Sequence, residues 1–231
     1  MAGTVSGSLV ALRGVGMEVS EPVATRILHP LDLDIAAATA VAVVGPSGAG
    51  KTTLASLIGA LQQPTEGSYR FDGKEIAGMS RAGLAEFRAR DVGFVFQHSH
   101  LIEERSVTAN VELGLVGADL SRAERADLCT TALEWVGLAA LAARRSGFLS
   151  GGERHRVAIA RALVKSPRLI IADEPTAALD QETGRGILEL LANATVHGAT
   201  VILVTHDPRA AEYVDAVHRI VDGRLVDEAH S

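Results

Sequence analysis

The stretch GPSGAGKTT, Gly45 to Thr53, decides the fold of this 231-residue chain. It contains the spacing G-x-x-x-x-G-K-[ST]; a short apolar run, Ala40 to Gly45, leads into it, and the segment Thr52 to Leu61 has apolar residues at helical spacing. Strand, glycine loop and helix in this order are the context that a phosphate-binding loop requires. The free amides of such a loop and of the first helical turn can surround phosphate oxygens. The alternative, a glycine-rich turn with an incidental lysine, does not account for both the pattern and its context.

Two side chains of the loop have specific expected roles. Lys51 is expected to reach the β- and γ-phosphates, and the hydroxyl of Thr52 is expected to ligate Mg²⁺. The remaining members are expected to bind the same phosphates through backbone or hydroxyl contacts: Gly45, Pro46, Ser47, Gly48, Ala49, Gly50 and Thr53.

A second apolar run, RLIIAD from Arg168 to Asp173, ends in a carboxylate that is expected to hold the magnesium directly or through water. Glu174 follows at once. Two adjacent acids at the end of a buried strand are costly unless they serve a cation or a water, so Glu174 is expected to polarise the water that attacks the γ-phosphate. The alternative is a pair of solvated acids at a strand end.

Strands and helices alternate along the rest of the chain. A third buried strand is predicted from Thr200 to Asp207, and helical segments are predicted from Ala158 to Leu163, Gln181 to Leu191 and Pro208 to Tyr213. This alternation predicts an α/β fold with a mainly parallel sheet that is covered on both faces.

Two regions have a different character. The first forty residues and the stretch from Gly67 to Ile76 are interpreted as short strands broken by turns, with Asp72-Gly73 as a hairpin signal, which predicts a small antiparallel sheet. Between Gln97 and Ser150 the pattern becomes helical. There Ser121 and Glu124 form a capping box, and apolar residues from Leu128 to Val136 recur on one face.

Composition narrows the class of protein. Apolar residues make up 47% of the chain, and 22 basic residues stand against 28 acidic ones, a net charge of −6 that offers no general attraction to nucleic acid. The single cysteine, Cys129, is expected to be a small buried apolar residue. With no N-terminal leader pattern and no run of 18 apolar residues, a reducing cytosolic location is expected.

These motifs describe a nucleoside triphosphatase, and LSGGE, Leu149 to Glu153, makes the class narrower. A Ser-Gly-Gly turn that opens a helix is another group of free amides able to bind phosphate. A single chain has no evident use for two such turns, and a kinase would leave LSGGE without a role.

Taken together, these motifs resemble those of the ATP-binding cassette (ABC) ATPases. LSGGE resembles the family signature, FVFQ (Phe94 to Gln97) its Q-loop, ADEPTAALD (Ala172 to Asp180) its Walker B motif and D-loop, and VTHD (Val204 to Asp207) its switch histidine. The resemblance covers about residues 10 to 225, in family order. It implies a P-loop NTPase fold: a RecA-like parallel sheet core, an antiparallel β subdomain and an inserted α-helical subdomain.

The resemblance also implies that two cassettes pair head to tail around each ATP. Ser150, Gly151 and Gly152 would then grip the γ-phosphate of the ATP bound to the opposite cassette. Asp180 would link the two sites, although on its own it could equally be an ordinary helix N-cap. Gln97 would contact the magnesium or the attacking water.

His206 would hold the γ-phosphate and orient Glu174. The other histidines, including His98, His100 and His155, are expected to be surface or interface residues. The chain departs from the family pattern in the loop around Met17 to Val19. The family commonly stacks an aromatic ring on adenine there, and this loop has none, so adenine is expected to rest on an aliphatic or thioether surface.

Local strings such as GFVFQHSHLIEERSVTANVELGL are most similar to the lipoprotein-releasing, macrolide-exporting and cell-division cassettes. The expected protein is therefore an ATP-hydrolysing transporter subunit that uses ATP and Mg²⁺. Its expected partners are a second cassette, in a homodimer, and a separate membrane permease, on the inner face of the cell membrane. The alternative is a soluble ABC ATPase in assembly or repair.

The expected organisation is one ABC ATPase domain over residues 1–231. In it, residues 1–97 and 163–231 would form the nucleotide-binding core with its β subdomain, and residues 98–162 would form the helical subdomain.

Overall fold

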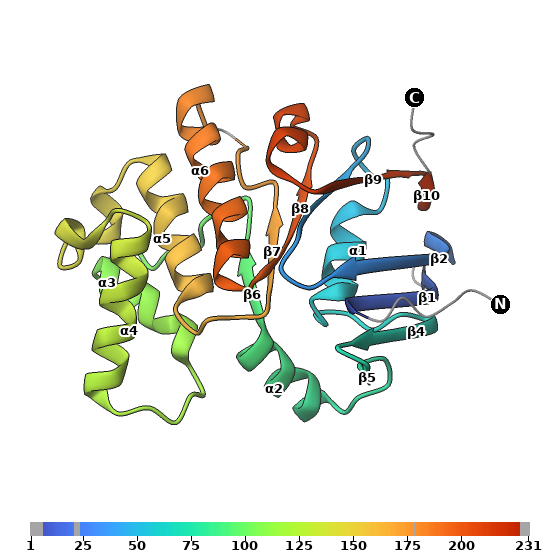
Figure 1. Cartoon of the computed structure of the whole chain (residues 1–231), viewed down its shortest axis with the longest axis horizontal. Helices are drawn as coiled ribbons and strands as arrows, with labels where there is room; N and C mark the ends of the chain where they lie inside the picture. Colours follow the sequence, from blue (N-terminus) through green and yellow to red (C-terminus); the bar gives the residue numbers. More distant parts are fainter. Residues whose placement is uncertain (1–6, 21–23, 178, 227–231) are drawn as a thin grey trace.

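The computed structural model describes residues 7–20, 24–177 and 179–226, which form two sheets and a layer of helices (Figure 1). The expectation about the N-terminal leader, and Ala178 of the ADEPTAALD motif, lie outside the described residues. In chain order the elements are β1 (Ser8–Val19), β2 (Thr25–Ala36), β3 (Ala40–Val44), α1 (Lys51–Ile58), β4 (Glu66–Phe71), β5 (Lys74–Glu75), α2 (Arg81–Asp91), β6 (Val92–Val95), α3 (Val107–Val111), the 3₁₀ helix η1 (Glu112–Leu115), α4 (Arg122–Trp135), η2 (Ala139–Leu141), η3 (Ser146–Phe148), α5 (Gly151–Leu163), β7 (Leu169–Asp173), α6 (Gln181–Asn193), η4 (Ala194–His197), β8 (Thr200–Thr205), η5 (Pro208–Tyr213), β9 (Ala216–Val221) and β10 (Arg224–Val226).

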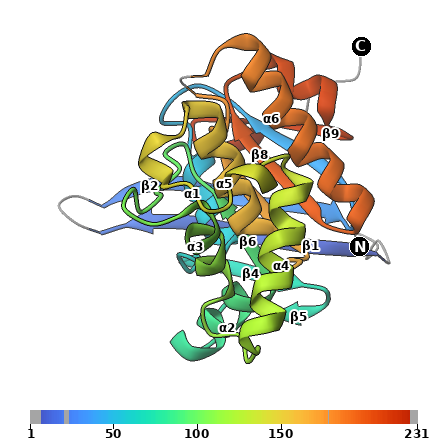
Figure 2. The ribbon, with the colours of Figure 1, turned by 90° about the vertical axis from the view of Figure 1, so that its left-hand side faces the viewer.

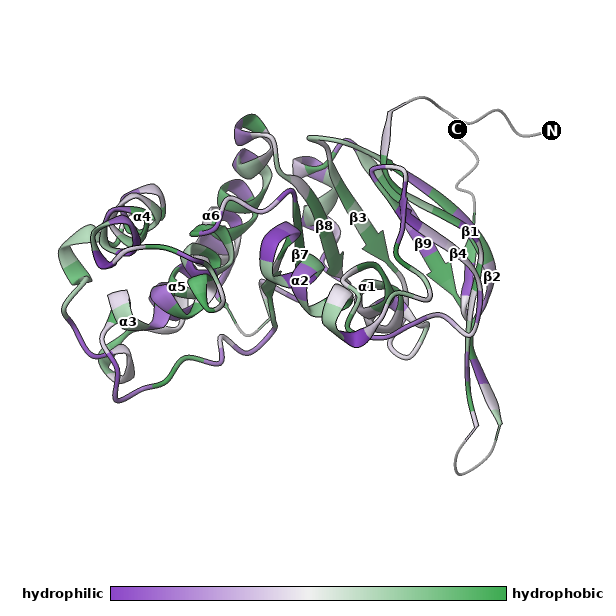
Figure 3. Ribbon diagram, turned by 90° about the horizontal axis from the view of Figure 1, so that it is seen from below, coloured by the Kyte–Doolittle hydropathy of each residue, from purple (hydrophilic) through white to green (hydrophobic). Residues whose placement is uncertain are grey.

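The larger sheet has the strand order β10-β9-β3-β8-β7-β6, and every pairing except β10 with β9 is parallel. Its central strands β3, β7 and β8 are buried along most of their length and stand out as apolar in Figure 3. Helices cover both faces, as a parallel sheet requires. The predicted α/β class and the three predicted strands are confirmed. The carboxyl ends of these strands lie together at one edge, which carries the motifs described below.

The smaller sheet is antiparallel, with the order β2-β1-β4-β5. Asp72 (φ 50°) and Gly73 (φ 74°) both take the left-handed conformation that a two-residue hairpin needs, so the predicted turn is confirmed. The prediction of short strands before residue 40 is wrong. β1 and β2 are twelve residues each, and repeated register shifts in their pairing break the apolar alternation that would have indicated long strands.

The chain between Gln97 and Ser150 is helical, as predicted, and packs with α5 and α6 at one end of the molecule (Figure 1). This end faces the viewer in Figure 2. α4 begins at the predicted capping box, in which Ser121 and Glu124 bond each other's backbone amides. Of the remaining segments, Pro208–Tyr213 is a 3₁₀ helix rather than an α-helix. Among the helices of the described ranges, none combines the length and the apolar character that crossing a bilayer requires.

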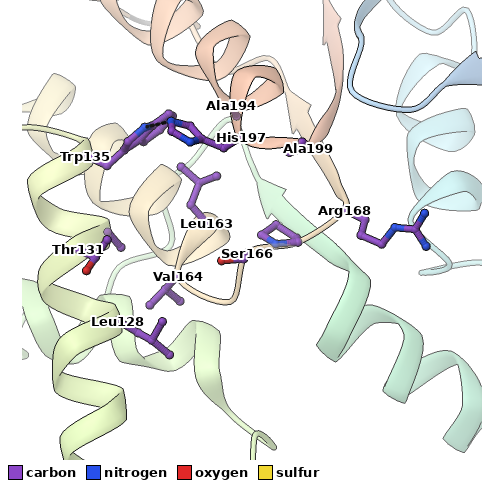
Figure 4. Close-up of a pocket in the computed structure, with 13 residues that line it drawn as sticks. Leu128, Thr131, Trp135, Leu163, Val164, Ser166, Arg168, Ala194, His197 and Ala199 are labelled. Carbon is purple, nitrogen blue, oxygen red and sulfur yellow. Dashed lines mark hydrogen bonds between the residues drawn. The ribbon is translucent and has the colours of Figure 1, made fainter.

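A cavity of about 370 Å³ lies between α4, the end of α5 and the start of β8 (Figure 4). Trp135 lines it and donates its indole N–H to Nε2 of His197 at 3.3 Å. Because an indole can only donate, Nε2 of His197 is the acceptor and the ring proton lies on Nδ1. This contact joins the helical layer to the sheet core.

Cys129 lies on the buried face of α4 and is 1% exposed, as expected. Burial raises the pKa of its thiol, so the thiolate is scarcer than in an exposed cysteine. We expect the folded chain to react with a thiol reagent such as DTNB at least about tenfold more slowly than the chain in guanidinium. Equal rates in the two conditions would show that the thiol is accessible in the native state.

Candidate active site

The phosphate loop lies between β3 and α1, and its shape depends on two glycines that have no room for a side chain. A Cβ on Gly45 (φ 156°) would lie 2.1 Å from the carbonyl oxygen of Ile220 on β9. A Cβ on Gly50 (φ 101°), the N-cap of α1, would lie 2.7 Å from Leu28 Cδ2 on β2. The loop is therefore held between the two sheets with the first amides of α1 free of side-chain caps.

Lys51 lies inside this loop and is 8% exposed. Its Nζ donates to the carbonyl oxygens of Gly45 and Pro46, both at 2.9 Å. The ammonium group thus already lies within the ring of backbone groups that a triphosphate would occupy. Anionic oxygens are stronger acceptors than these carbonyls, so the lysine is placed to exchange one set of partners for the other.

Thr52 and Asp173, both predicted as metal ligands, lie together: the hydroxyl of Thr52 donates to Oδ1 of Asp173 at 3.3 Å. The pKa of Asp173 is raised by its burial, and the neighbouring charge of Glu174 raises it further, against the bond from Thr52 and the charge of Lys51. A partly buried carboxylate whose charge is poorly compensated, beside a hydroxyl, is a donor set that suits Mg²⁺. Within the described residues, no group of three or more His, Cys, Asp or Glu is arranged to hold a metal ion. Mg²⁺ commonly needs only one or two carboxylates together with phosphate oxygens and water.

Glu174 has a backbone conformation that is uncommon for a residue with a side chain (φ 49°). Its amide donates to Val204 of β8 at 2.7 Å, which holds this turn against the sheet. Its carboxylate accepts from the hydroxyl of Thr205 at 3.1 Å and contacts Nδ1 of His206 at 2.9 Å. The Glu174 side chain is 18% exposed and that of His206 is 73% exposed, so the carboxylate is fixed while the imidazole faces outward.

The signature turn, residues 150–152, opens α5. Ser150 is the N-cap, and it and Glu153 form a second capping box that leaves the amides of Gly151 and Gly152 free of side-chain caps. A Cβ on Gly152 would lie 2.5 Å from Thr183 Cγ2 of α6, so this turn packs against α6. Asp180, the N-cap of α6, accepts from the amide and hydroxyl of Thr183, and these bonds hold the pKa of its carboxyl below the usual range.

No hydrogen bond or ion pair in the described ranges joins residues 150–152 to residues 45–53. The loop contacts β2 and β9, whereas the signature turn contacts α6. The fold therefore brings Lys51, Thr52, Asp173, Glu174 and His206 to one edge of the sheet and leaves the second group of free amides apart from them.

His155 is the residue that the sequence analysis missed. It was expected at the surface or an interface, and that prediction is wrong, because the residue is 8% exposed. Its Nδ1 faces the carbonyl oxygen of Gly151 at 3.0 Å, and its Nε2 faces that of Gln97 at 3.1 Å. The ring therefore links the backbone at Gln97, whose side chain is exposed, to the signature turn. The signal was present, since Ala158, Ile159 and Ala162 form an apolar helical stripe whose spacing also includes position 155.

Tyr69, the first aromatic residue of the chain, is buried and donates its hydroxyl to the carbonyl of Ile58 at 2.6 Å. It is therefore not an exposed platform for a base. The stretch that was expected to be a loop, where the family pattern has an aromatic ring, is the end of strand β1. There Met17 packs partly buried against the core and Val19 is 40% exposed.

Comparison with known families gives one clear match. The model of the family described as "ABC transporter" matches residues 28–177. The chain is 45% identical over 223 residues to the macrolide export ATP-binding/permease protein MacB 1/2 of Paracoccus denitrificans, covering 94% of this chain and 33% of that protein. The chain thus spans about a third of the length of this relative.

Two further similarities extend over nearly the whole of both chains. The chain is 44% identical to the lipoprotein-releasing system ATP-binding protein LolD of Chromohalobacter salexigens, covering 90% of this chain and 88% of that one. Among solved structures, the ATP-binding cassette MJ0796, a dimer in a post-hydrolysis state bound to ADP and Pi, superposes with a TM-score of 0.84 at 35% identity, covering 94% of this chain and 96% of that one.

Proposed function

This chain belongs to the ABC transporter family, as one of its ATP-binding cassettes, and we propose that it is the ATP-hydrolysing subunit of a transporter that works as a head-to-tail dimer. The observation that carries the proposal is the separation of its two phosphate-binding turns. Each turn offers free amides at a helix N-terminus, yet one chain does not bring them together. A second copy placed head to tail would supply the signature turn to each phosphate loop.

In this mechanism the chain's own groups bind and orient the reactants. The loop amides and Lys51 hold the triphosphate, and Ser150, Gly151 and Gly152 of the opposite cassette close over its γ-phosphate. Glu174 accepts a proton from the attacking water, while His206 fixes that carboxylate and faces the γ-phosphate. Loss of the cleaved phosphate removes the group that both cassettes hold, so the pair reopens.

Thr52, Asp173 and Gln97 would hold the Mg²⁺ that ATP brings. When bound, it would neutralise charge on the β- and γ-phosphates. Asp180 lies beside the signature turn, at the N-terminus of α6, where it would contact the opposite cassette.

The partner outside the cassette is proposed to be a membrane permease, because the MacB relative is named as an ATP-binding/permease protein and is about three times as long as the match. The chain would then lie on the cytoplasmic face of the cell membrane. Residues 98–162 are proposed as the helical subdomain that meets the permease, and residues 1–97 and 163–231 as the nucleotide-binding core.

This proposal is tested by affinity purification from detergent-solubilised membranes. We expect a polytopic membrane protein to copurify, and its addition to the pure chain to change the ATPase rate. Copurification with soluble assembly or repair proteins alone, with no membrane protein, would favour the alternative of an ABC ATPase without transport.

The two capping boxes offer a matched pair of variants for the signature turn. Ser121→Ala and Ser150→Ala each remove one N-cap, so each is expected to lower the free energy of unfolding by about 1 kcal/mol. Only Ser150→Ala removes a group from the proposed phosphate contact, and only it should lower the ATPase rate, by at least about tenfold. Equal ATPase rates in the two variants would contradict the role of Ser150.

A further inference from the structure

The turn before the signature carries an exposed aromatic ring. Among the Phe, Tyr and Trp side chains of the described ranges, only that of Phe148 is exposed, at 68%, and the others are buried or half-buried. Within the same ranges its ring forms no aromatic or cation–π contact. The ring is therefore available to a molecule outside this chain.

The backbone places this ring on the same side of the chain as Ser150. Leu149 and Ser150 are both extended, with φ and ψ of −86° and 146° for the first and −63° and 163° for the second. In an extended chain, alternate side chains share a face. Leu149 is 6% exposed, whereas Phe148 and Ser150 are both exposed. The ring therefore lies on the face that carries the signature serine.

The turn that carries the ring is fixed to its surroundings on two sides. The amide of Ser146 donates to the carbonyl oxygen of Arg105 at 2.9 Å. From α5, the guanidinium of Arg154 donates to the carbonyl oxygens of Gly147 at 3.1 Å and Leu149 at 3.3 Å. A ring on a backbone that is already ordered loses less conformational entropy when it packs against a ligand.

The phosphate loop has an aliphatic surface beside it on which a base could rest. Gly50 of the loop lies against Leu28 of β2, and Met17 of β1 lies opposite Leu28 in the smaller sheet. Two residues farther along, β1 ends at Val19, which is 40% exposed. A base that rested on Val19 would have one face on an aliphatic side chain and the other face uncovered.

We infer that Phe148 stacks on the base of the nucleoside triphosphate bound to the opposite chain, on the face that Val19 leaves uncovered. The inference rests on the proposed head-to-tail dimer and adds to it a residue that binds the nucleoside. With Ser150 at the γ-phosphate, the two-residue step back to Phe148 spans at most about 7 Å of chain, and the side chain adds its own length. The ring can therefore extend along the triphosphate toward the nucleoside.

Stacking suits this position because every base has a π-face that an aromatic ring can cover. The ring would hold a purine without reading the hydrogen-bonding groups at its edge. It would also supply, from the opposite chain, the aromatic contact that the aliphatic end of β1 does not provide.

The test uses the Glu174→Gln chain as the parent and measures, by light scattering, the ATP concentration that gives half-maximal dimerisation. Phe148→Ala in this parent should raise that concentration about tenfold, because each site loses a ring stacked on the base. Phe148→Tyr keeps the ring and should match the parent, whereas Phe148→Leu keeps only apolar surface and should resemble Phe148→Ala. Val196→Ala, which removes exposed apolar surface on η4, is the matched control and should match the parent.

Two further measurements separate stacking on the opposite nucleotide from other contacts. At protein concentrations too low for dimers, the parent and Phe148→Ala should bind ATP equally, because the ring acts only across the pair. Phe148→Trp adds an indole whose fluorescence a stacked purine quenches. Dimerisation with ATP should therefore quench the emission of this variant far more than that of the parent, whose single tryptophan is Trp135.

Half-maximal dimerisation at the same ATP concentration in the parent and Phe148→Ala would overturn the inference. So would weaker ATP binding by the Phe148→Ala monomer, since the ring would then act in its own chain. A Phe148→Trp dimer that forms without added quenching would overturn it too, because the ring would then contact protein rather than the base. With a parent that dimerises, each of these results removes the role of Phe148 alone. If the parent forms no ATP-bound dimer, the proposed function fails first.

Discussion

Glu174→Gln is expected to bind ATP as the wild-type chain does and to hydrolyse it about 10²- to 10⁴-fold more slowly. The glutamine keeps the size of the side chain, and its one amide oxygen can still accept the bond from Thr205, but it cannot take a proton from water. Because hydrolysis is what reopens the proposed pair, the variant should accumulate as an ATP-bound dimer. Single-turnover hydrolysis measures the first effect, and light scattering after size exclusion measures the second.

The control for this variant is Thr205→Val, which removes one bond to the carboxylate and leaves the carboxylate in place. It should lower the rate less than Glu174→Gln does. Turnover at the wild-type rate in Glu174→Gln would show that another group accepts the proton, and the assignment of the base would then be withdrawn.

Lys51→Ala is expected to lose the binding of ATP itself. The ammonium group is the only charged group of the loop, and removing it takes away charge-assisted bonds to two phosphates, each worth about 1.5–3 kcal/mol. We therefore expect the dissociation constant for ATP to rise by at least about 100-fold. Isothermal titration with ATP measures it.

Lys165→Ala, which removes a partly buried lysine that donates to the carbonyl oxygen of Arg88, is the matched control and should bind ATP as the wild-type chain does. Tight ATP binding by Lys51→Ala would contradict the role given to this lysine. Weak binding by both lysine variants would point to a general loss of structure, which thermal unfolding would reveal.

The sequence predicted the parallel core well, because its signals are local. β3, β7 and β8 are continuous apolar runs, and the turn after β3 needs glycine at Gly45 and Gly50 for reasons that the pattern itself encodes. The sequence did not predict the lengths of β1 and β2 correctly. There the bulges shift the side-chain alternation, so long strands looked like short ones.

In the candidate site too, contacts with a local sequence signal could be predicted and contacts that depend on long-range packing could not. Spacing alone indicated that Lys51, Asp173 and Glu174 lie near one another, since the ends of parallel strands share an edge. The bridge that His155 makes to the carbonyl of Gln97 joins residues 58 positions apart and depends on the packing of α5. No local pattern encodes a contact of that range. The burial of this histidine could have been predicted from the helical stripe, which the sequence analysis did not use.

The central claim is that each active centre uses the phosphate loop of one chain and the signature turn of another, and mixing two inactive variants tests it most directly. In a mixed dimer of Lys51→Ala with Ser150→Ala, one site combines the altered phosphate loop with the altered signature turn. The other site carries neither substitution. Because half of randomly paired dimers are mixed and each has one intact site of two, the mixture should recover about a quarter of the wild-type ATPase rate. A mixture no faster than the average of the two separate variants would contradict the claim.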